Sequence, residues 1–155
     1  MGDRRKDEEA LALVHSIFEK RIPFNKVLGV TIDRLTFDRA ALRFSMREEL
    51  VGNYLRQSLH GGVIAAALDL TGGLVAFLSA IKGMEGEPAE KKMERLASVG
   101  TIDLRVDYLR PGTGRHFLAT GFILRAGNKV AVTRMELHND KKSLIAVGTG
   151  AYMVG

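Results

Sequence analysis

The sequence predicts an α+β protein in which an antiparallel sheet curls around one long apolar helix. Residues 63–81 are predominantly apolar with one charged residue, Asp69, and this run is too long for a strand. Residues 99–153 contain four successive strand patterns with no alternation of strand and helix, which favours antiparallel pairing. A chain of 155 residues is expected to form one domain, residues 1–155, with residues 1–22 as an N-terminal helical extension.

The elements before the long helix are predicted to be another helix and a hairpin. Apolar residues recur at helical spacing within residues 3–20, and Pro23 is expected to end this helix. Residues 28–37 alternate loosely and residues 42–46 alternate clearly between apolar and polar, so they predict two paired strands. Residues 48–58 are polar and predict a loop.

The segments after the long helix are predicted to be a connection and four strands. Residues 82–95 are rich in Gly, Glu, Lys and Pro and predict a solvated connection. Alternation and turn signals place strands at residues 99–108, 117–125, 130–138 and 144–153.

Composition narrows the class of partner. The net charge of +5 favours anionic ligands, but the charges are scattered and aromatic residues make up only 6% of the chain. We therefore rank a phosphorylated small molecule above nucleic acid. The absence of Cys excludes disulfides and thiolate metal sites. The first residues are charged and no signal-peptide pattern follows, so we expect a cytoplasmic protein.

The long apolar run also permits a transmembrane interpretation, because about 18 apolar residues suffice to cross a bilayer. Asp69, the Gly72-Gly73 pair and the soluble-type strands that follow oppose that interpretation. We expect a buried helix and no membrane partner.

The motif Ser58-Leu59-His60-Gly61-Gly62 leads into this helix and places its N-terminus at two glycines. The first N–H groups of a helix lack intrahelical partners, and glycine lets a ligand approach them, so the motif predicts an oxyanion or anion site. The alternative is that the glycines only allow the chain to turn tightly into the helix.

Asp69 is the sharper signal, because a carboxylate in an apolar helix must be paired, hydrogen-bonded or functional. Positions one helical turn away hold only Ala and Gly, so no intrahelical ion pair accounts for it. One interpretation is a structural Asp bonded to a neighbouring backbone, and the other is a general base or nucleophile at an acyl centre.

Gly61 and Asp69 are about 12 Å apart along one helix, at a rise of about 1.5 Å per residue. They cannot both contact one carbonyl group within a single subunit. If they cooperate, two chains must share the site, which predicts a homodimer with two composite sites.

The motif Leu59-His60-Gly61-Gly62-Val63-Ile64, followed by Leu68-Asp69, resembles the hotdog-fold thioesterases of the PaaI-like group, and within it the YigI-type acyl-CoA thioesterases. The spacing from His to the acid also resembles the Arthrobacter-type hydroxybenzoyl-CoA thioesterases. The likeness extends from about Pro23 to the C-terminus and includes Pro23-Phe24-Asn25, Val51-Gly52-Asn53, Thr101-Ile102-Asp103, Tyr108 to Gly112, Arg125-Ala126-Gly127 and Glu136-Leu137-His138-Asn139.

The resemblance implies a hotdog fold, a homodimer or dimer of dimers, and hydrolysis of medium- or long-chain acyl-CoA without a cofactor. It implies that the Gly61 N–H polarises the thioester carbonyl and that Asp69 activates water or attacks directly; the sequence leaves these two mechanisms open. Asn53 would hold substrate or water, and Thr101 would assist the water. His60 matches the family His at the helix start. The alternatives are that Asn53 is a turn residue, His60 a helix cap and Thr101 an ordinary strand residue.

Two positions depart from the family pattern. Tyr54 follows Asn53 where the similar group often has Pro, which bears on the shape of this loop. Gly73 stands where the hydroxybenzoyl-type enzymes carry a hydroxyl residue, which favours a fatty acyl over an aryl substrate. The CoA phosphates require cations. Arg110, Arg125 and Lys129 border predicted turns and are candidates, the alternative being solvated surface charges.

Other functions are weighed against this one. A non-catalytic acyl-CoA binding or sensing module has no need of an unpaired acid, and fold alone does not secure an activity. A hotdog dehydratase needs a differently placed His. The four His residues show no metal-ligand spacing, so no metal is expected. Acyl length, and whether CoA or an acyl carrier protein bears the acyl group, stay open.

Overall fold

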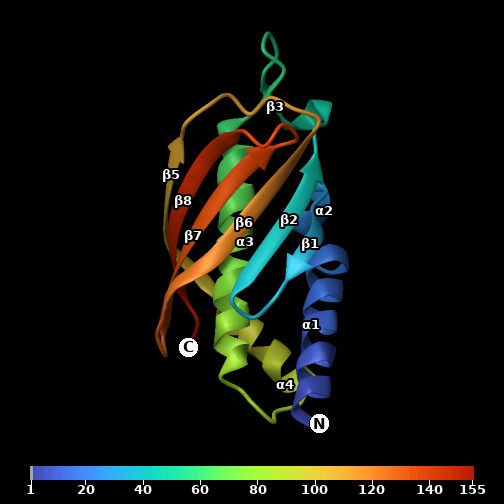
Figure 1. The fold of residues 1–155 in the computed structure, drawn as a ribbon, viewed down its shortest axis with the longest axis vertical. Helices are drawn as coiled ribbons and strands as arrows, with labels where there is room; N and C mark the ends of the chain where they lie inside the picture. The colour runs from blue at the N-terminus through green and yellow to red at the C-terminus, as the bar shows by residue number, and fades with distance from the viewer. Residues whose placement is uncertain (1) are drawn as a thin grey trace.

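The computed structural model describes residues 2–155 and has the long helix α3, Gly61–Lys82, at its centre. One antiparallel sheet consists of β1 (Thr31–Leu35), β2 (Arg39–Ser45), β5 (Gly100–Tyr108), β6 (His116–Ala126), β7 (Val130–Asn139) and β8 (Leu144–Met153). Its strand order is β1-β2-β6-β7-β8-β5, and it curves around α3 (Figure 1). The predicted α+β architecture is confirmed.

The helix α3 is a core helix. It is long and apolar enough to cross a membrane, but most of its surface is buried within the fold. Contacts with β2, β5, β6, β7 and β8 cover it on several sides, which is what a helix apolar around its whole circumference requires. Burial against the sheet therefore accounts for the hydropathy that also permitted the transmembrane interpretation.

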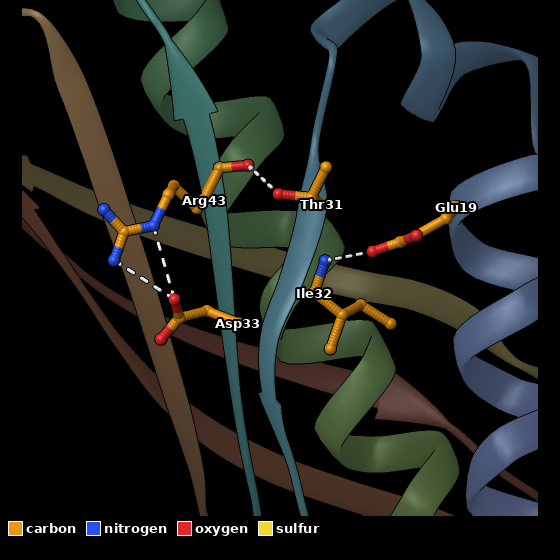
Figure 2. A network of polar contacts seen from close by, with 5 residues as sticks. All are labelled: Glu19, Thr31, Ile32, Asp33 and Arg43. Carbon is orange, nitrogen blue, oxygen red and sulfur yellow. Dashed lines mark hydrogen bonds and ion pairs between the residues drawn. The ribbon is translucent and has the colours of Figure 1, made fainter.

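Helix α1, Gly2–Lys20, covers the β1 edge of the sheet (Figure 1). Its residues Val14 and Phe18 are buried in the same cluster as α3, and the Phe18 and Phe77 rings are 6.5 Å apart. Glu19 accepts a hydrogen bond from the Ile32 main-chain N–H at 2.7 Å, as Figure 2 shows. A side chain of α1 thus satisfies a donor on the outer side of an edge strand.

Strands β1 and β2 form the hairpin at this edge, and an ion pair connects them. Arg43 on β2 donates to Asp33 on β1 at 3.1 Å (Figure 2). The hairpin prediction is confirmed, although β1 is shorter than the predicted strand over residues 28–37. Pro23 does not simply end the first helix: it begins a second one, α2 (Pro23–Leu28), because proline fits the first helical position.

Two segments expected to be irregular contain regular structure. Residues 48–58 form a 3-10 turn, η1 (Glu48–Leu50), and a short hairpin, β3 (Val51–Asn53) with β4 (Ser58–Leu59), which projects beyond the sheet in Figure 1. Strands of two or three residues are too short to show alternation, so the sequence pattern did not reveal them.

The connection after α3 is also more ordered than predicted. It contains α4 (Ala89–Glu94) and the 3-10 turn η2 (Arg95–Ser98). Lys92 on α4 is 1% exposed, and its ammonium lies 3.3 Å from Asp7 of α1. A charged composition suggested solvation, but lysine buries its aliphatic stem readily when its terminal charge finds a partner.

A test of the packing around α3 uses two adjacent glycines. A Cβ added at Gly72 would lie 2.4 Å from the Tyr152 hydroxyl and 2.8 Å from Thr133 Oγ1, whereas at Gly73 its nearest neighbour is 3.4 Å away. We expect Gly72→Ala to lower the free energy of unfolding by about 2–3 kcal/mol through overpacking. Gly73→Ala should stay within about 1 kcal/mol of wild type, because alanine also favours the helix. Urea denaturation of both variants measures the difference, and equal stabilities would contradict the packing described.

Candidate active site

The sequence-predicted residues form two clusters on α3, separated along the helix. The first, here the oxyanion cluster, consists of His60, Gly61 and Tyr108. The second, here the acid cluster, consists of Asp69, Thr101 and Tyr152. Gly61 and Asp69 belong to the same helix, so the expected separation of about 12 Å holds in the structure.

The oxyanion cluster leaves one donor of the helix N-terminus free. His60 is the N-cap residue, and its Nδ1 accepts a hydrogen bond from the Gly62 N–H at 2.8 Å. The N–H groups of Val63 and Ile64 donate to the His60 carbonyl. The Gly61 N–H has no acceptor among residues 2–155, so it is the donor available to a ligand.

This contact is a helix-capping hydrogen bond of His60. Because Nδ1 accepts a hydrogen bond, a neutral ring carries its proton on Nε2. The ring is exposed, and its role in the structure is to satisfy a helix N–H that would otherwise compete with Gly61 for a ligand.

Tyr108 of β5 completes the oxyanion cluster. Its hydroxyl donates to the Gly61 carbonyl at 2.9 Å, and its ring lies 3.4 Å from where a Cβ of residue 61 would be. A pocket of about 370 Å³ opens here, lined by Gly61, Ile64, Tyr108 and Arg110 among others. The sequence pattern did not single out Tyr108, because alternation marks it only as a strand residue.

The acid cluster joins α3 to two strands. Asp69 is half-buried, and its Oδ1 accepts hydrogen bonds from Thr101 Oγ1 of β5 at 3.0 Å and from the Tyr152 hydroxyl of β8 at 3.1 Å. The sequence alone suggested a buried acid without a partner. In the structure Asp69 is only half-buried and has two hydrogen-bond partners. Its partners are hydroxyl donors from the sheet, which a search for cations one helical turn away does not detect.

Tyr152 is the main residue of this site that the sequence did not predict. Burial, and then the negative charge of Asp69, raise the pKa of the Tyr152 hydroxyl far above its ordinary value. The hydroxyl therefore stays protonated and acts as a donor. The signal available was the Gly72-Gly73 pair, since two glycines inside a helix leave space for a large neighbouring side chain.

Asn53 lies at the same end of α3 as the oxyanion cluster. It is exposed on β3, and its Oδ1 accepts a hydrogen bond from the Arg56 N–H at 3.2 Å, as in a turn. A Cβ on the preceding residue, Gly52, would lie 2.5 Å from the His60 Cα, so only glycine lets this hairpin approach the helix start. Within one subunit Asn53 does not contact Asp69.

The three candidate cations lie at opposite ends of the sheet in one subunit. Arg110 lines the pocket beside Gly61, and its guanidinium donates to the Leu144 carbonyl at 2.9 Å. The Lys129 carbonyl accepts a hydrogen bond from the Val154 N–H, and Arg125 lies on the adjoining part of β6. The length of β8 separates Arg110 from these two by about 30 Å. Arg56, which the sequence did not single out, lines a neighbouring pocket with Arg110.

Among residues 2–155, no group of three or more His, Asp or Glu side chains is placed to hold a metal ion. The chemistry that the two clusters offer is a free backbone donor for a developing oxyanion and an oriented carboxylate. These are the two groups that acyl transfer to water requires.

Comparison with known proteins agrees with this geometry. The family model for the thioesterase superfamily matches residues 57–146, which include both clusters except for Tyr152; Asn53 also lies outside the matched residues. The medium/long-chain acyl-CoA thioesterase YigI of Escherichia coli K12 is 49% identical over 148 residues, covering 96% of each chain. Its counterpart in Salmonella typhimurium is also 49% identical over the same span.

Solved structures show the same fold. A Shewanella oneidensis protein related to the thioesterase superfamily superimposes with a TM-score of 0.91 at 47% identity, covering 96% of this chain and 97% of that one. The PaaI protein of E. coli superimposes with a TM-score of 0.76 at 18% identity, covering 97% of this chain and 96% of that one. The chain belongs to the thioesterase superfamily and has the hotdog fold.

Proposed function

We propose that this protein hydrolyses medium- and long-chain acyl-CoA thioesters to a free fatty acid and CoA. The observation that carries the proposal is the acid cluster: a carboxylate set into an apolar helix, held by two hydroxyl groups and, among the residues that the structure describes, by no cation. The near full-length identity of 49% to acyl-CoA thioesterases named for medium and long chains supports the substrate class.

In this proposal the free Gly61 N–H donates to the thioester oxygen as negative charge develops on it. Asp69 acts as the base for a water molecule or attacks the carbonyl carbon itself, and both mechanisms remain open. Thr101 holds the Asp69 carboxylate, Asn53 lies where it contacts substrate or water, and His60 shapes the helix start. Neither a metal nor a cofactor has a part.

Two copies of the chain share each site in this proposal. The separation of Gly61 and Asp69 along α3 supports it, because a two-fold axis beside the helix brings the oxyanion cluster of one copy to the acid cluster of the other. The same axis brings Arg110 of one copy toward Arg125 and Lys129 of the other, where the phosphates of CoA need cations. The assembly is a homodimer or a dimer of dimers, and the proposed location is the cytoplasm.

The alternative function is an acyl-CoA binding or sensing module without catalysis. The pocket beside Gly61 and the cations near it would serve a binder equally well. The carboxylate of Asp69 distinguishes the two, because placing an acid close to an anionic ligand weakens binding and benefits only a reaction.

The first test of the function is Asp69→Asn. Asparagine has nearly the same shape and can still accept from Thr101, so the fold should persist while hydrolysis falls by roughly a hundredfold or more. Release of free thiol from a panel of short, long and aryl acyl-CoAs measures the effect and the chain-length preference. Asp38→Asn, which changes an exposed acid paired with Lys82, serves as a matched control. A near-normal rate in Asp69→Asn would remove Asp69 from the mechanism, and no turnover by wild type would favour the binding module.

The second test addresses the shared site. Asp69→Ala and Gly61→Val should each be inactive alone, the second because its side chain fills the approach to the Gly61 N–H. When the two are refolded together, half the dimers are mixed and each mixed dimer has one intact site, so about one quarter of wild-type activity should return. Each variant refolded by itself is the control. Mixed dimers that are present but inactive would refute the shared site.

A further inference from the structure

Tyr152 is a buried tyrosine that the sequence motif does not contain and to which the proposed reaction steps assign no role. It is 1% exposed, lies on β8, and is 83 positions from Asp69 in the chain. We propose that Tyr152 is the positioning residue for Asp69, binding one carboxylate oxygen so that the other is directed at the thioester. This inference rests on the proposed function and concerns the same site.

The hydrogen bonds give the carboxylate two unlike oxygens. The Tyr152 hydroxyl lies 3.1 Å from Asp69 Oδ1, and Thr101 Oγ1 donates to the same oxygen at 3.0 Å. Among residues 2–155 none donates to Oδ2. A carboxylate otherwise rotates over a broad range about its terminal torsion, so two donors arriving from two strands restrict it. Oδ2 is then the oxygen that meets water or the carbonyl carbon.

The fold leaves out two side chains to admit this tyrosine. An added Cβ would lie 2.4 Å from the Tyr152 hydroxyl at Gly72 and 2.7 Å from the ring at Gly150. Glycine inside a helix or strand costs about 0.5–1 kcal/mol relative to alanine. The ring is therefore confined to one position, and its hydroxyl also lies 3.1 Å from the Asp69 carbonyl oxygen.

The protonation state of Tyr152 fits positioning and does not fit proton transfer. Burial first, and the charges of Asp69 and Asp103 after it, raise the pKa of the hydroxyl, so it does not release its proton at any pH suited to catalysis. A protonated hydroxyl is a donor and not a base. Its one hydrogen bond is shared between Asp69 Oδ1 and the Asp69 carbonyl oxygen, both 3.1 Å away, so both acceptors of Tyr152 belong to Asp69.

The decisive variant is Tyr152→Phe, which keeps the ring in its slot and removes only the hydroxyl. We expect kcat to fall roughly tenfold while KM stays within about twofold. The variant removes a hydrogen bond to the reacting carboxylate and leaves the contacts of the bound substrate unchanged.

The matched control is Thr71→Val. Thr71 is fully buried on α3, and its hydroxyl donates to the Ala67 carbonyl at 2.7 Å without contacting Asp69. This variant removes a buried hydroxyl from the same core, so it should change the melting temperature comparably and leave kcat within about twofold of wild type. Replacing Tyr152 with para-aminophenylalanine restores a donor and should return kcat partway to wild type. A restored donor without any gain over Tyr152→Phe would count against the inference.

A measurement without substrate separates this inference from the proposed function. The carbon-13 NMR signal of the Asp69 carboxyl, recorded at neutral pH, should differ between Tyr152→Phe and wild type, because the carboxylate has lost a donor. Wild type without turnover would refute the function while this signal still tests the contact. An unchanged signal, or an unchanged kcat in Tyr152→Phe, would overturn the positioning role.

Discussion

The apolar surface of α3 has to be removed from water on most of its sides, and this constraint determines the arrangement of the other elements. A sheet that merely lay against one face of the helix would leave the opposite face exposed. The curved sheet, α1 and the segment after α3 together cover it. Once a helix is enclosed in this way, its N-terminus and its single acid are among the few polar groups it can present to a ligand.

The arrangement of hydroxyl groups around Asp69 follows from the same enclosure. A carboxylate next to an apolar core needs hydrogen-bond partners, and the nearest backbone groups of α3 are already used within the helix. The sheet supplies the partners instead, from β5 and β8. Asp69 is thus supported by residues of two strands that follow it in the chain by 32 and 83 positions.

The long helix and the sheet could be predicted from sequence because their signals are local: a long apolar run, then alternation with turn residues. The motif that contains His60, Gly61 and Asp69 could be singled out for the same reason, since it is continuous in the chain. Tyr152 and Tyr108 could not, because their contacts depend on which strand lies beside α3. Lys92 was misjudged since its burial depends on α1, 85 positions earlier. The catalytic and binding roles predicted for the site residues and the three basic residues stay proposals.

The two edges of the sheet differ in a way that limits how copies of the chain can join. At the β1 edge α1 runs alongside, and the Glu19 carboxylate occupies the Ile32 donor (Figure 2). At the other edge, no strand within residues 2–155 pairs with the outer side of β5. A sheet with one covered edge and one unpaired edge can pair with another copy at the unpaired edge alone, so it can be extended only once. Continuous growth of the sheet into a fibre, the hazard of exposed strands, is therefore prevented by a single helix on the opposite side of the molecule.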